Sequence, residues 1–171
     1  MGEQGEWHEA EMVKTAKMLG DLGIRHNCDH VPPNGRRIRL GRANQGAFSD
    51  FAYPDFLCLS SDGKPRFIIE IMDGNGRPKD LVGIVACIAL CDSWIDDGGS
   101  PVPLGKITLV ISLNSRRLEG KSDSGRVSGK SVQLTALKGG IQSVFGDGIG
   151  AIDSVVFCEV SQLQNLLKTI V

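Results

Sequence analysis

The chain has 171 residues, which suits one domain with a sizeable buried core, and we expect residues 1–171 to form a single domain. Its net charge of −1 excludes a whole-chain electrostatic preference for nucleic acid or membrane. No apolar run approaches the roughly 20 residues of a membrane helix, and from the acidic N-terminus we expect no signal peptide. The cysteines are five, an odd number, and most lie in apolar runs, which favours reduced thiols in a cytoplasmic protein without a membrane partner.

The first half of the chain predicts one helix followed by extended segments. The predicted elements are, in chain order, a helix over 7–22, an irregular stretch over 24–34, a strand with a loop over 35–46, and two paired strands over 50–59 and 66–72. Met12, Val13, Ala16 and Leu19 form the apolar face of the helix. A turn at residues 60–63 makes the two paired strands an antiparallel hairpin.

The second half alternates helices and strands. The predicted elements are a buried helix over 78–94, a strand over 106–113, a loop over 114–130, a strand over 154–160 and a terminal helix with Ser161 as N-cap. The continuous apolar run of residues 106–113 predicts a central, parallel strand. This order predicts an α/β fold with a mixed sheet of about four to five strands flanked by helices.

Two acidic residues in the hairpin indicate a site. Glu70 lies inside the apolar run IIEIM, where an unpaired carboxylate is costly to bury. Asp55 lies on the partner strand, so both carboxylates can converge at one end of the sheet and bind a hard divalent cation. The alternatives are that Asp55 caps a turn and that Glu70 pairs with Lys64 or Arg66.

The first helix offers a third carboxylate. Glu9 precedes Met12 by three residues and Val13 by four, so we expect it to face the core, whereas Glu11 points away. A glutamate that faces the core needs a partner, and a metal site shared with Asp55 supplies one.

The spacing of these residues resembles a known group. Pro54-Asp55, followed by fourteen residues and then Glu70-Ile71-Met72, is similar to the PD-(D/E)xK nuclease superfamily, which includes restriction endonucleases and Holliday-junction resolvases. The resemblance covers roughly residues 7–113. It implies a restriction-endonuclease-like three-layer core and hydrolysis of phosphodiester bonds in double-stranded DNA, dependent on Mg²⁺ or Mn²⁺.

The resemblance also implies roles for individual residues. Asp55 and Glu70 would bind the metal, with the backbone carbonyl of Ile71 as a further ligand, and Glu9 would be the acidic residue of the first helix. Because one site cuts one strand, cleavage of both strands favours a symmetric homodimer.

Met72 departs from the pattern, which has lysine at this position. One account is that Lys79, or else Arg77, supplies the missing cation. A second is that metal ions alone activate the water. A third is that the chain is a catalytically inactive DNA-binding or assembly module, either naturally or through a lysine-to-methionine change.

Basic residues gather in two segments without enough acids to neutralise them. Those that could contact DNA phosphates are Arg36, Arg37, Arg39 and Arg42, then Arg77, then Arg116 and Arg117. The alternative is an ordinary solvated surface or connector. The segment GRVSGKS fails the spacing of a phosphate-binding loop, so we expect no nucleotide cofactor. RNA cleavage is a weaker alternative to DNA cleavage.

Overall fold

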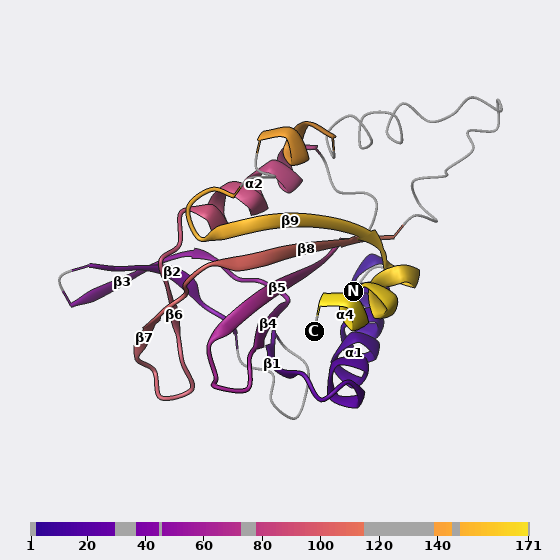
Figure 1. Cartoon of the computed structure of the whole chain (residues 1–171), viewed down its shortest axis with the longest axis horizontal. Helices are drawn as coiled ribbons and strands as arrows, with labels where there is room; N and C mark the ends of the chain where they lie inside the picture. Colours follow the sequence, from indigo (N-terminus) through magenta and orange to yellow (C-terminus); the bar gives the residue numbers. More distant parts are fainter. Residues whose placement is uncertain are drawn as a thin grey trace.

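The computed structural model describes residues 3–29, 37–44, 46–72, 78–114, 139–144 and 148–170 (Figure 1). The named elements are α1 (Glu3–Asp21), β1 (Arg25–Cys28), β2 (Leu40–Asn44), β3 (Ala47–Ala52), β4 (Phe56–Leu59), β5 (Pro65–Met72), α2 (Pro78–Ala89), β6 (Ser93–Ile95), β7 (Pro101–Pro103), β8 (Ile107–Leu113), β9 (Ile152–Glu159), the 3₁₀ helix η2 (Val160–Gln162) and α4 (Leu163–Ile170). A short helical segment also covers residues 139–144.

The strands form two sheets. The central sheet has the order β1-β4-β5-β8-β9, in which β1, β4 and β5 are antiparallel neighbours and β5, β8 and β9 are parallel neighbours. The second sheet, β3-β2-β6-β7, is antiparallel throughout. The predicted α/β fold with a mixed sheet is therefore confirmed, and the second sheet is an addition that the sequence did not predict.

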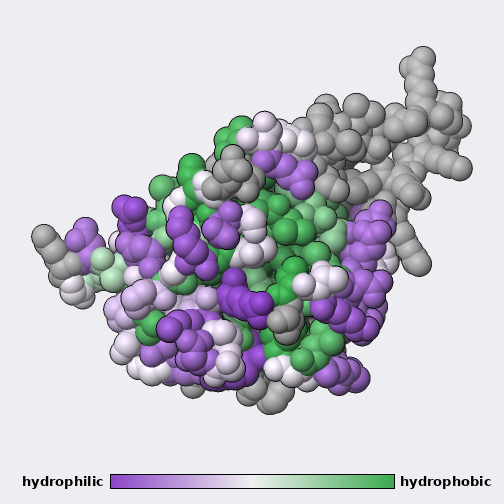
Figure 2. Space-filling model, in the orientation of Figure 1, coloured by the Kyte–Doolittle hydropathy of each residue, from purple (hydrophilic) through white to green (hydrophobic). Residues whose placement is uncertain are grey.

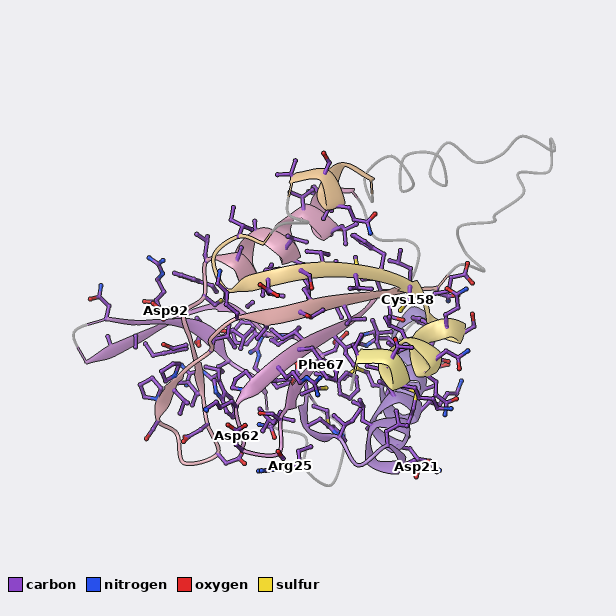
Figure 3. The ribbon with its side chains drawn as sticks, viewed as in Figure 1. Asp21, Arg25, Asp62, Phe67, Asp92 and Cys158 are labelled. Atoms are coloured by element: carbon purple, nitrogen blue, oxygen red, sulfur yellow. The ribbon has the colours of Figure 1, made fainter. Side chains whose placement is uncertain are left out.

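Helices cover both faces of the central sheet, giving three layers. On one face, Leu81, Val85 and Ile88 of α2 pack with Ile68 of β5 in one hydrophobic cluster. On the other face, the helices α1 and α4 pack against Phe67, Ile69 and Ile71 of β5 in a second cluster. Phe67 and Cys158, labelled in Figure 3, lie on this second side. The alternation of β5 side chains between two buried faces explains the unbroken apolar sequence of this strand.

Part of the hydrophobic surface lies over the edge of the central sheet. Figure 2 shows hydrophobic surface in the middle of this view, where the edge strand β9 lies between α2 and α4. None of the described helices is long and apolar enough to span a membrane. All five cysteines are thiols, as the sequence predicted.

The strand predicted over residues 50–59 is wrong in one respect, because Pro54 divides it. Proline has no N–H to donate to a ladder, so the chain leaves the second sheet at Ala52 and enters the central sheet at Phe56. The interruption places Asp55 at the first position before β4. The predicted hairpin of residues 60–63 is present, with Gly63 at φ +81° and its N–H donated to the Ser60 carbonyl.

Other boundaries also differ from the prediction. The stretch over 24–34 contains β1, and the helix predicted over 78–94 ends at Ala89 because residues 93–95 pair with β2 as β6. Ser161 is not the N-cap of the terminal helix. The 3₁₀ turn that opens this helix is capped by Glu159, whose backbone N–H lies 3.5 Å from the side-chain oxygen of Gln162.

A close approach at Gly41 tests the pairing of β2 with β3. A Cβ at Gly41 would collide with the Ser49 carbonyl oxygen, so Gly41→Ala should lower the free energy of unfolding by about 1–3 kcal/mol. Gly83 is the matched control, since a Cβ there meets no described atom within 4 Å and Gly83→Ala in α2 should stabilise by about 0.5–1 kcal/mol. Urea unfolding measures both, and equal effects of the two substitutions would contradict the close approach.

Candidate functional site

Three carboxylates from neighbouring strands lie at one end of the central sheet. The register pairs Phe56 of β4 with Ile69 of β5, which brings the preceding residue, Asp55, beside Glu70. On the other side of β4, Asp29 follows β1, and its backbone N–H donates to the Asp55 carbonyl over 2.9 Å. The structure therefore brings together Asp55 and Glu70, as predicted, and adds Asp29, which the sequence reading missed.

The Asp55 side chain is held by two contacts. Its Oδ2 accepts a hydrogen bond from the backbone N–H of Ile71 over 2.7 Å, and Nε2 of His8 lies 3.3 Å from the same atom. Only 15% of the Asp55 side chain is exposed, compared with 39% for His8. Because these partners come from β5 and α1, Asp55 ties the end of the sheet to a helix rather than capping a local turn.

Glu70 is a half-buried carboxyl in a negative environment. Burial raises its pKa well above the usual value, and the negative charges of Asp55 and then Asp29 raise it further. Lys64 and Arg66, the alternative partners predicted for Glu70, contact other groups. Lys64 pairs with Asp62 at 2.9 Å, and Arg66 donates to the Ile170 carbonyl. A cation bound by Asp55 and Glu70 would lower the cost of ionising Glu70.

The donor set fits a magnesium ion better than a metal held entirely by protein. Within the described residues, no group of three or more His, Cys, Asp or Glu side chains is arranged to hold a metal ion. Magnesium characteristically uses one or two carboxylates and completes its shell with water and substrate phosphate. Asp55 and Glu70 can supply those two carboxylates.

The expected orientation of α1 is wrong. Glu9 is exposed, whereas His8 contacts Asp55 and the Glu11 side chain is only 13% exposed. The predicted apolar face included Val13, which is 51% exposed, while Met12 is buried. The buried face in the structure does not include Val13, so it is rotated by a fraction of a turn from the predicted face and carries His8 instead of Glu9. None of the described contacts joins Glu9 to Asp55, and its role as a metal ligand is unsupported by this orientation.

The structure does not bring a replacement cation to Glu70. Met72 is half-buried and packs against the cluster that α2 covers. Lys79 is exposed near the start of α2, and no ion pair among the described residues joins it to Asp55 or Glu70. The role of Lys79 stays a prediction, while Arg77 lies outside the described residues, as do Arg36, Arg116 and Arg117.

The described arginines among those predicted to contact DNA already have partners. Arg37 stacks over the Tyr53 ring at 3.8 Å, and Arg39 donates two hydrogen bonds to Asp50, at 2.9 and 3.1 Å. Arg42 donates to the Leu90 carbonyl and lies 3.8 Å from Asp92. Asp92 lies at the β2–β3 end of the molecule, whereas Cys158 lies at the opposite end, near the carboxyl end of β9 (Figure 3). Arg42 is therefore remote from the carboxylates, and DNA contact by these arginines stays a prediction.

Comparisons with protein-family models, with curated proteins and with solved structures gave no match. The functional assignment therefore depends on the geometry of the carboxylates and on the chemistry that this geometry permits.

Glu70→Gln should make the protein more stable at about pH 7 without divalent cations. Because the pKa of Glu70 is raised on folding, the folded state binds more protons than the unfolded state between the ordinary value of 4.5 and the raised value. Stability therefore falls as pH rises through this window, and glutamine removes that loss. Urea unfolding in EDTA across the window measures the effect.

Glu9→Gln is the matched control, since Glu9 is an exposed glutamate on α1 and should keep the wild-type pH dependence. An equal pH dependence for Glu70→Gln and the wild type would contradict the electrostatic description of Glu70.

Proposed function

We propose that the chain is a Mg²⁺-dependent endonuclease that hydrolyses phosphodiester bonds of double-stranded DNA, with Mn²⁺ as a second usable ion. The observation that carries the proposal is the meeting of Asp29, Asp55 and Glu70 at the end of the sheet, where Glu70 is half-buried among like charges. The resemblance to PD-(D/E)xK nucleases is supported by the element order, since an antiparallel β4–β5 hairpin is followed by α2 and by β8 parallel to β5.

The proposed roles follow from the contacts of each residue. Asp55 and Glu70 would hold the ion, with the Ile71 carbonyl as an additional ligand. When bound, the ion would supply an ionised water and neutralise charge on the phosphate. The Ile71 N–H and His8 fix Asp55 through Oδ2, so that the carboxylate is oriented before a substrate binds. Asp29 adds negative charge that favours a cation at this position.

A second candidate is a nuclease fold that binds DNA or assembles without cutting. The packing of Met72 against the core favours it, because methionine provides no charge where the superfamily has lysine. The exposed Lys79 has no ion pair with the carboxylates among the described residues. A symmetric homodimer and a cytoplasmic location stay predictions under either candidate.

Cleavage of supercoiled plasmid tests the first candidate. Wild-type protein with Mg²⁺ should nick the plasmid, and Asp55→Ala should lower the rate by at least about 100-fold, since loss of a direct ligand should exceed the effect of an outer partner. Asp29→Asn should have a smaller effect, about tenfold. Asp62→Asn removes an exposed carboxylate paired with Lys64 and should cut like the wild type. Absence of cutting with every divalent metal would reject the active enzyme.

Met72→Lys separates the two candidates. Lysine and methionine have side chains of similar length, so the substitution should preserve the fold while adding a charge beside Glu70. If the chain is a disabled nuclease, Met72→Lys should gain Mg²⁺-dependent cutting that Glu70→Gln in the same background abolishes. If the wild type already cuts, its rate should change little with Met72→Lys, and Lys79→Ala should then show whether Lys79 contributes.

A further inference from the structure

A pocket of about 370 Å³ lies between α1 and the ends of β8 and β9. Its walls are Trp7 and Lys14 of α1, Asn114 after β8, and Ser161 of η2. It continues between α1 and α4 as a second hollow of about 280 Å³, which shares Lys14 and Ser161. An elongated hollow of this kind suits part of a chain-like ligand better than an isolated small molecule.

The pocket and the carboxylates occupy the same edge of the sheet. Strands β5, β8 and β9 are parallel, so their carboxyl ends meet there, which is where open α/β sheets bind ligands. Two wall residues of the pocket are linked to the chain around the carboxylates. Trp7 precedes His8, which contacts Asp55, and the Asn114 N–H donates to the Met72 carbonyl over 3.0 Å. A substrate at Asp55 and Glu70 could therefore extend into the pocket.

The chemistry of the walls favours a neutral, planar group with polar edges. Trp7 is half-buried and offers an aromatic ring for stacking. The Asn114 amide and the Ser161 hydroxyl can each donate and accept hydrogen bonds. Lys14 is paired with Glu11 at 2.6 Å, which neutralises the main positive charge in the pocket and disfavours a phosphate there.

We propose that this pocket holds an unpaired nucleobase of the strand whose phosphate lies at Asp55 and Glu70. The inference rests on the proposed nuclease or DNA-binding function and narrows its substrate. A base within a duplex is stacked and paired, whereas a base at a flap, overhang or junction can leave the helix and stack on Trp7. The preferred substrate is therefore a nucleic acid with an unpaired nucleotide beside the scissile phosphate.

Fluorescence anisotropy tests the preference without requiring cleavage. The probes are a labelled blunt duplex and the same duplex with a short single-stranded flap, measured with Ca²⁺ in place of Mg²⁺. Wild-type protein should bind the flap duplex at least about fivefold more tightly, the lower end for stacking one base on an aromatic ring. Trp7→Ala should remove this difference and leave binding of the blunt duplex unchanged, whereas Trp7→Phe should retain it.

A second variant and a second signal guard against misfolding of Trp7→Ala. Asn114→Leu retains the backbone contact with Met72 and should also reduce the preference. A 2-aminopurine base in the flap should lose fluorescence on binding to the wild type and to Trp7→Phe, but not to Asn114→Leu. A duplex with a ribonucleotide flap tests whether a base of RNA can also occupy the pocket. A preference for either flap that depends on Trp7 supports the proposal that the pocket binds an unpaired base.

The outcomes separate this inference from the proposed function. The proposal that the pocket holds a base is overturned if the wild type binds the blunt and flap probes equally. It is also overturned if the preference survives both Trp7→Ala and Asn114→Leu, even if the protein cuts plasmid. A Trp7-dependent preference in a protein that never cuts supports the pocket and rejects only the nuclease.

Discussion

The pairing of β4 with β5 is the constraint on which the site depends. The turn at residues 60–63 fixes the register that places Phe56 opposite Ile69, and Asp55 and Glu70 follow from it. A shift of one residue would turn Glu70 to the other face of the sheet and move the apolar residues that α1 and α4 cover to the face that α2 covers. Hydrophobic packing on both faces therefore fixes the position of the carboxylates as well as the fold.

The same arrangement imposes an electrostatic cost. Glu70 is half-buried beside two other acids, and His8 is a partner of one of them, Asp55. Groups that weaken a fold in this way are typical of functional sites, where a ligand relieves the repulsion. A divalent cation would do so at the end of the sheet, and a nucleic acid strand could then follow the edge from the carboxylates to Trp7.

The sequence predicted the parts of the site that depend on local patterns. The β4–β5 hairpin, the parallel strand β8 and the pair Asp55 and Glu70 follow from turn residues and strand alternation, which act over a few positions. The prediction failed where tertiary contacts decided the structure. Pro54 separates two strands only because two sheets are available, and β6 forms from residues that read as helix because β2 offers a partner.

The helix α1 illustrates how a small error moves a site residue. Val13 is apolar but exposed, and including it shifted the predicted core face from His8 to Glu9. Asp29 was missed because β1 is only four residues long and its strand pattern was too brief to separate from a loop. A buried pattern of Met12, Thr15 and Leu19, spaced by three and four residues, was the signal that would have placed His8 at the site.

Anomalous diffraction from crystals grown with Mn²⁺ tests the central claim most directly. The proposed site predicts an anomalous peak within coordination distance of both the Asp55 and the Glu70 carboxylates, which is lost from crystals of Glu70→Gln. A wild-type structure that shows no manganese at these residues, or shows it only elsewhere on the surface, would contradict the account.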